Sequence, residues 1–125
     1  MITCGGMIVC LAAAVFYALI TPIENRKDMQ AKYDVGALQK VLALFKKDEG
    51  RYPTQEESLT ILLKSPQGKH YVVSSHALRD PWQRSFVYQA PGANATTPPL
   101  IYSVGPNGVD EHGAGDDITQ TTQLK

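Results

Sequence analysis

The chain has 125 residues, the length of one domain, and equal formal charges, with Lys+Arg 12 against Asp+Glu 12. Because phosphate binding needs a basic excess or a basic patch, this balance argues against nucleic acid as a partner. No long run of like charge is present that would form an acidic or basic tail.

The first element is an uncharged apolar segment from Ile2 to Ile20. About 20 apolar residues are needed to cross a bilayer as a helix, so the segment predicts a membrane helix. A cleaved secretory signal and a buried soluble helix are the alternatives, and the positive n-region of a signal is missing ahead of the apolar run. Cys4 and Cys10 would lie far apart along such a helix, so no bridge between them is expected.

The helix is expected to continue well beyond the apolar segment. Pro22 would bend it or mark its exit from the apolar zone. An apolar stripe then recurs at helical spacing, and Gly50 is typical of a C-terminal cap. One bent helix ending near Glu49 would be roughly 70 Å long, more than a small head can cover. Its surplus must contact lipid or other subunits. The stripe consists of Val35, Leu38, Val41, Leu42 and Phe45.

A short second helix is predicted after an extended connector, Arg51-Tyr52-Pro53. Thr54 and Glu57 have the spacing of a capping box. Leu59, Leu62 and Leu63 would form the apolar face of this helix, which must end before Pro66.

The remainder predicts a small antiparallel sheet. Ser85–Gln89 and Leu100–Val104 have strand composition and would pair as a hairpin with a long loop, and Ile118-Thr119 would add an edge strand. A short strand is also possible near residues 71–73. Asp80-Pro81-Trp82 reads as a turn that places Trp82 in the core. The expected fold class is α+β, with segments 1–23 spanning the membrane, 24–50 completing the helix and 51–125 forming the head.

One loop has the composition of a metal site. Carboxylates, an amide oxygen and backbone carbonyls are ligands that Ca²⁺ takes, and glycines let the backbone curl around an ion. The spacing is not that of an EF-hand, and a solvated acidic turn is the alternative. His112 alone is a weak indication of a transition metal. The acidic and amide residues are Asn107, Asp110, Glu111, Asp116 and Asp117, among Gly105, Gly108, Gly113 and Gly115.

No enzyme active site is indicated. Ser74, Ser75 and His76 are adjacent, which is the wrong geometry for a nucleophile and its base, and His70 has no acidic neighbour in sequence. No convergent set of catalytic side chains is visible, so the chain is not expected to be an enzyme.

Several separate motifs agree with one family in order and spacing. Together they resemble the major pseudopilin of the bacterial type II secretion system, a type IV pilin-like family. The motifs are Asp34–Thr54, Leu59, Asp80-Pro81-Trp82, Tyr88, Pro91-Gly92, Ser103-Val104-Gly105, Gly108 and Asp117-Ile118.

The resemblance implies a pilin-like fold: a long N-terminal helix, a short second helix and a small antiparallel head that ends in a metal-binding loop. It also implies a structural subunit of a periplasmic filament that drives protein export across the outer membrane. The expected partners are further copies of the chain, other pseudopilins and inner-membrane assembly proteins. The expected location is the bacterial inner membrane, single-pass, with the head in the periplasm.

Calcium ligands carry over to four positions of this loop. The resemblance implies the backbone carbonyl of Val104 and the side chains of Asp116 and Asp117, with Asn107 standing where the family usually has Asp. An amide oxygen still ligates Ca²⁺ but brings one negative charge fewer. From loop chemistry alone, Asp110 would restore that charge.

The N-terminus departs from the family pattern, which has a basic leader, a Gly–Phe cleavage point and a glutamate near the mature start. This chain opens Met1-Ile2-Thr3-Cys4-Gly5 and has no acidic residue before Glu24. Either the chain begins downstream of the true start or it is a divergent member. The alternative function is therefore a divergent or minor pseudopilin that acts as a monomeric, membrane-anchored binding module.

Overall fold

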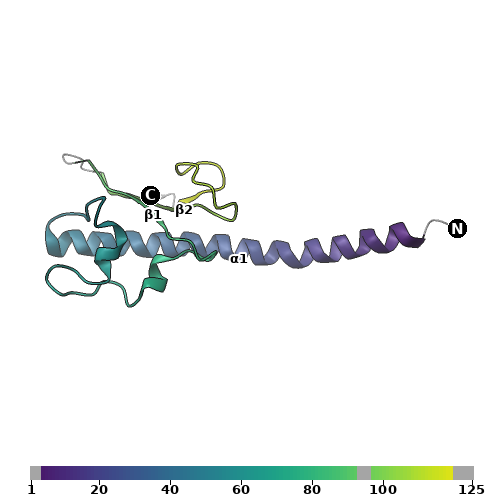
Figure 1. The fold of residues 1–125 in the computed structure, drawn as a ribbon, viewed down its shortest axis with the longest axis horizontal. Helices are drawn as coiled ribbons and strands as arrows, with labels where there is room; N and C mark the ends of the chain where they lie inside the picture. Colours follow the sequence, from purple (N-terminus) through teal and green to yellow (C-terminus); the bar gives the residue numbers. More distant parts are fainter. Residues whose placement is uncertain (1–3, 93–96, 120–125) are drawn as a thin grey trace, which may run out of the picture.

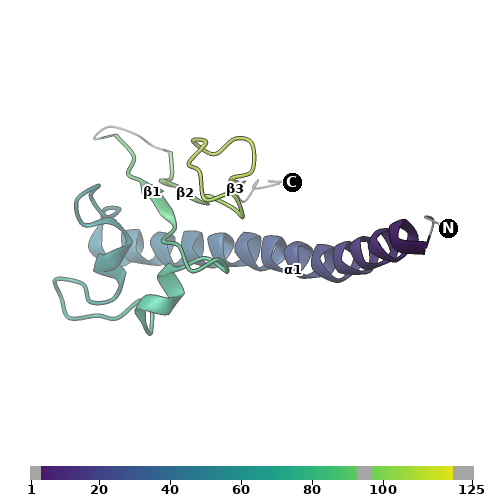
Figure 2. The same ribbon diagram turned by 45° about the vertical axis from the view of Figure 1, so that its right-hand side comes forward.

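One helix runs through the first third of the chain and organises the rest (Figure 1). The computed structural model describes residues 4–92 and 97–119, without the side chains of residues 4–14 and 20–24. Helix α1 spans Cys4–Glu49, 46 residues, and its backbone stays helical through Pro22. At 1.5 Å per residue it is about 69 Å long, as predicted. The ribbon curves gently toward its N-terminus (Figures 1 and 2).

Helix α1 ends as its sequence predicts. Gly50 adopts φ +77°, and its N–H donates to the carbonyl of Lys46 at 2.8 Å. This is the left-handed cap that favours glycine, because a Cβ at that φ is strained. Lys46 and Lys47 lie in the last turn, where positive charge suits the helix dipole.

The capping box forms, but the helix behind it is not an α-helix. The Glu57 N–H donates to Oγ1 of Thr54 at 3.1 Å, and the Thr54 N–H donates to Oε1 of Glu57 at 2.9 Å. Ser58 then adopts φ +51°, which interrupts the turn. The 3₁₀ helix η1 follows at Ser58–Leu62. Its period of three places Leu59 and Leu62 on one buried face, whereas Leu63 is only partly buried.

Residues 71–73 form no strand, so the prediction of a short strand there was wrong. The N–H groups of Tyr71 and Val72 both donate to the carbonyl of Leu62, which ties this segment to the end of η1. A second 3₁₀ helix, η2, follows at Ser75–Leu78, where no helix was predicted.

The predicted three-stranded antiparallel sheet is present. Strand β1 is Val87–Gln89, β2 is Leu100–Ser103 and β3 is Ile118–Thr119, in the order β1-β2-β3. In the hairpin, Val87 pairs with Tyr102 and Gln89 with Leu100.

A single core lies between the sheet, the two 3₁₀ helices and the C-terminal half of α1. The predicted stripe supplies the helix side of it: Val35, Leu38, Leu42 and Phe45 are buried, with Val41 partly buried beside them. Figures 1 and 2 show the head gathered on this half of α1, while the N-terminal half extends away from it.

Asp80, rather than Trp82, occupies the buried position of the Asp-Pro-Trp turn. Trp82 is partly exposed and lies outside the core cluster, so the prediction of a core tryptophan was wrong. Asp80 is 2% exposed. Its Oδ1 accepts from the N–H groups of Trp82 and Arg84, and its Oδ2 accepts from Oγ of Ser103 at 2.7 Å. The carboxylate thereby fastens the turn to strand β2.

Candidate functional site

The exposed face of α1 is the first candidate site. Met29 and Tyr33 are 71% and 73% exposed, and Leu44 is 47% exposed. At 100° per residue these three side chains share one face, opposite the stripe that packs on the head. Large exposed apolar side chains that share a face are typical of a surface that binds a partner, and here the exposed Lys40 separates Leu44 from Met29 and Tyr33.

At residues 15–19, α1 is exposed on every side. Val15, Phe16 and Leu19 are 57%, 67% and 65% exposed, and residues 15–19 are exposed without interruption. Of the predicted membrane segment, Ile2–Ile20, residues 2 and 3 lie outside the described residues, and only residues 15–19 have described side chains. Across the residues that are described, no helix combines the length and apolar character that a membrane crossing requires. Segment 1–23 as a membrane span therefore stays a prediction.

The acidic loop between β2 and β3 is the second candidate site. Its side chains brace its own backbone through numerous hydrogen bonds. Oδ2 of Asp116 accepts from the Asn107 N–H at 3.1 Å, and Oδ1 of Asn107 accepts from the Val109 N–H at 2.9 Å. Glu111 adds a contact that the sequence did not indicate, since its Oε1 accepts from Nδ2 of Asn107 at 2.6 Å.

Asp117 is the member of the set with a buried oxygen that accepts no hydrogen bond among the described residues. Its Oδ2 accepts from the N–H groups of Glu111 and Gly113 at 2.8 and 2.9 Å. Its Oδ1 is buried and has no hydrogen-bond partner among the described residues. A buried carboxylate oxygen without a donor is costly unless a cation or water takes it, so the oxygen suits a cation.

Gly105 brings the backbone of Val104 close to the acidic end of the loop. A Cβ on Gly105, which has φ +70°, would lie 2.2 Å from the carbonyl oxygen of Asp116. Only glycine therefore allows this approach. The predicted ligands Val104, Asn107 and Asp116 thus belong to one compact turn.

The Asp110 side chain binds strand β2 and not the other predicted calcium ligands. Its Oδ1 accepts from the hydroxyl of buried Tyr102 at 2.7 Å and from the His112 N–H at 2.9 Å. The Tyr102 hydrogen bond is the main cause of the lowered pKa of Asp110, whereas burial, aided by that bond, raises the pKa of Tyr102 to about 12. Asp110 therefore anchors the loop to strand β2. Over residues 4–92 and 97–119, no three His, Cys, Asp or Glu side chains converge as a metal site.

Arg84 supplies a positive charge beside the same loop. Its guanidinium donates to the carbonyl of Gly105 at 2.8 Å. A Cβ on Gly108 would lie 2.8 Å from the guanidinium carbon, so Arg84 packs directly on that glycine. Because Asp80 accepts from the Arg84 N–H, the buried turn and the acidic loop are joined through one residue.

Comparisons with known proteins agree with this architecture. The family model for type II secretion system protein G matches residues 18–121. The chain is 30% identical to a type II secretion system core protein G of Klebsiella pneumoniae, covering 93% of this chain and 89% of the relative. It is also 30% identical to the corresponding protein of Pseudomonas aeruginosa, covering 89% and 84%.

A solved structure has the same fold. The major pseudopilin of enterohaemorrhagic Escherichia coli superposes with a TM-score of 0.62 at 27% identity, covering 80% of this chain and 87% of that one. This family consists of structural secretion subunits and is not an enzyme family. The long helix, the small antiparallel head and these matches together place the chain in the type II secretion system protein G family, the major pseudopilins.

Proposed function

We propose that this chain is a structural subunit of a type II secretion pseudopilus and polymerises through α1. The observation that supports polymerisation most directly is the exposure of Met29, Tyr33 and Leu44 on the face of α1 that the head leaves uncovered. Burying such side chains stabilises an assembly by about 25 cal/mol per Å² of apolar area. Packing against further copies would remove this surface from water.

The proposal includes the location and partners that such a subunit needs. Segment 1–23 would anchor the chain in the inner membrane as a single pass, with the head in the periplasm. Other pseudopilins and inner-membrane assembly proteins would start the filament, and its growth would push cargo across the outer membrane. The chain would have no enzymatic activity of its own.

Site-specific crosslinking in cells tests the proposal. A photo-crosslinking amino acid in place of Tyr33 should give a ladder of dimers, trimers and larger species of this chain. The same amino acid in place of Lys64, an exposed residue of the head, is the matched control and should give far less. A chain that stays monomeric with either probe would contradict polymerisation.

A monomeric binding module is the second candidate. In that case the Tyr33 probe should crosslink to one defined protein of different mass and form no ladder.

Calcium in the loop after β2 is also part of the proposal. Val104 would offer its carbonyl, with Asn107, Asp116 and Asp117 offering side-chain oxygens. This choice is supported by Oδ1 of Asp117, which is buried and has no hydrogen-bond partner in the described part of the chain. When bound, the ion would neutralise the carboxylates and hold the loop closed. Asp110 would act mainly through Tyr102 and would be at most an outer ligand.

Thermal unfolding tests calcium separately from assembly. If the folded loop binds the ion and the unfolded chain does not, added Ca²⁺ should raise the melting temperature of the full chain. Asp117→Asn should remove most of the rise, whereas Glu56→Gln, on an exposed acid outside the loop, should leave it unchanged. Equal melting temperatures in EDTA and in excess Ca²⁺ would contradict calcium binding by the loop.

A further inference from the structure

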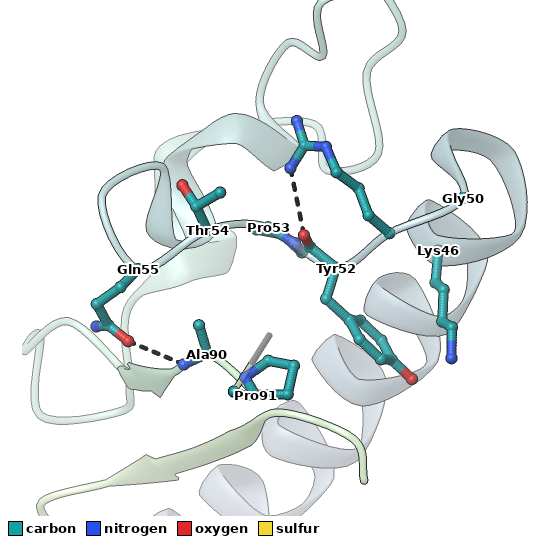
Figure 3. Close-up of a pocket in the computed structure, with 10 residues that line it drawn as sticks. Lys46, Gly50, Tyr52, Pro53, Thr54, Gln55, Ala90 and Pro91 are labelled. Atoms are coloured by element: carbon teal, nitrogen blue, oxygen red, sulfur yellow. Dashed lines mark hydrogen bonds between the residues drawn. The ribbon is translucent and has the colours of Figure 1, made fainter. Parts of the chain in front are cut away.

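A groove lies beside the C-terminal end of α1, between the connector that follows the helix and the end of strand β1 (Figure 3). Its volume is about 610 Å³, within the range of binding pockets. Tyr52, Pro53 and Pro91 supply apolar walls. Tyr52 also lines a smaller adjoining cavity of about 170 Å³ that includes Pro98 and Pro99.

The walls of the groove are held in place by hydrogen bonds. The side chain of Gln55 donates to the carbonyl of Tyr88 and accepts from the Ala90 N–H, both at 2.8 Å. The hydroxyl of Tyr88 donates to the carbonyl of Pro53 at 2.7 Å. The connector and strand β1 are therefore fastened together, which makes the groove a preformed feature.

The groove is cationic. Lys46 and Arg51 line it, and no acidic residue does. Arg51 is paired with Glu57. The Lys46 ammonium lies 4.8 Å from the centre of the Tyr52 ring and has no ion pair within the part of the chain that the structure describes. The groove thus combines apolar walls with one available positive charge.

The tip of the acidic loop has properties that complement the groove, namely an exposed apolar side chain and a negative charge. Val109 is 57% exposed and is followed directly by Asp110, whose side chain is 44% exposed. Among the residues that the structure describes, Asp110 is bound through Oδ1 only, which leaves Oδ2 for a partner. Between Gly105 and Asp117 the loop carries four carboxylates and no Lys or Arg. Two charges from a bound Ca²⁺ would still leave it negative.

The groove and the loop lie apart along the axis of α1. Figures 1 and 2 show the acidic loop displaced toward the N-terminal side of α1 relative to strand β1 and the connector. Two different patches of one subunit that complement each other make a heterologous contact, which builds an open helical filament when the rotation between copies does not close a ring.

We infer that the loop tip Asn107–Glu111 of one copy docks in the groove of the next, with Val109 against Tyr52 and the prolines and Asp110 facing Lys46. This inference rests on the proposed filament and adds a head-to-head contact to the packing of the helices. The interaction would be salt-sensitive because its charged part lies at the surface.

Photo-crosslinking from the loop tip tests the contact. A photo-crosslinking amino acid at exposed Val109, in the full chain in cells, should give a dimer whose crosslinked peptide maps to residues 46–55 or 90–92. Lys46→Glu should reduce this dimer at least fivefold. Lys47→Glu, the same charge change on the neighbouring exposed lysine outside the groove, should not.

The Tyr33 probe separates the two proposals. If its ladder persists while the Val109 probe crosslinks to another region or another protein, or Lys46→Glu and Lys47→Glu have equal effects, the docking contact is overturned and the filament stands. If the Tyr33 ladder is absent as well, the filament proposal fails and the docking contact fails with it.

Discussion

The two faces of α1 carry similar side chains in opposite surroundings. Val35, Leu42 and Phe45 face the head and are at most 1% exposed, whereas Met29 and Tyr33 face away and are more than 70% exposed. Sequence periodicity predicted the covered face as the apolar stripe, whereas the exposure of Met29 and Tyr33 on the other face emerges only from the folded head. One face of the helix is therefore covered by the head of the same chain, and the other is exposed and available to a partner. Substitutions on the two faces should have different consequences.

The largest effect is expected on the covered face. Phe45→Ala should lower the free energy of unfolding by about 3–5 kcal/mol, because it leaves a cavity where a fully buried ring packs edge-to-face on Tyr71. Urea denaturation of the full chain measures the change. A loss below 1 kcal/mol would mean that the head is not anchored on this face of the helix.

The next effect concerns the buried carboxylate that ties the Asp-Pro-Trp turn to the sheet. Asp80→Ala should cost about 2–3 kcal/mol, because two N–H groups and the Ser103 hydroxyl lose their acceptor. Glu56→Ala, at an exposed acid, should change stability by less than about 0.5 kcal/mol and serves as the control. If the two substitutions had equal effects on stability, the Asp80 carboxylate would not be what fastens the turn to strand β2.

These two residues also mark what the sequence could and could not reveal. Phe45 belongs to a periodic stripe, and the stripe, the Gly50 cap, the capping box and the three strands all follow from local patterns. Asp80 binds Ser103, which lies 23 residues away, so nothing local indicated that the carboxylate would be buried in place of Trp82. Long-range contacts decide such positions.

The candidate sites were predictable to different degrees. The composition of the acidic loop indicated its ligand types, but not that Asp110 binds Tyr102 or that Glu111 braces Asn107. The groove had no sequence signal, because its walls come from segments about 40 residues apart that only the sheet brings together. Element η1 is a 3₁₀ helix where the sequence predicted an ordinary short helix, and its first residue, Ser58, has a positive φ that no sequence pattern indicated.

A smaller loss of stability is expected from breaking the Thr54–Glu57 capping box. Thr54→Ala removes the hydroxyl that accepts from the Glu57 N–H and should cost about 1 kcal/mol. Thr54→Ser keeps an acceptor and should retain most of the stability. If Ser and Ala lower the urea midpoint equally, the hydroxyl does not act as a cap.

Glu57 gives the same end of the head a pH dependence. Its hydrogen bonds with Arg51 and then Thr54 lower its pKa from 4.5 to about 2. The ionised form therefore stabilises the fold above about pH 4.5, and this contribution is lost as the pH falls toward 2. Glu57→Gln can keep the capping bond without the charge. Its melting temperature should fall less steeply than that of the parent over this range, and parallel curves would contradict the assignment.

The smallest effect on stability is expected on the uncovered face, and it is the most informative about function. Tyr33→Ala should change the free energy of unfolding by less than about 0.5 kcal/mol, because the ring is 73% exposed and packs little on the head. If the ring contacts a neighbouring copy, however, the same substitution should shorten or abolish the crosslinked ladder, read from a second probe at Met29. Phe45→Ala would reduce assembly only by unfolding the head, whereas Tyr33→Ala would reduce it with urea denaturation unchanged. A Tyr33→Ala chain that is destabilised by more than 1 kcal/mol would show instead that this face is covered within the monomer, and the distinction between the two faces would be lost.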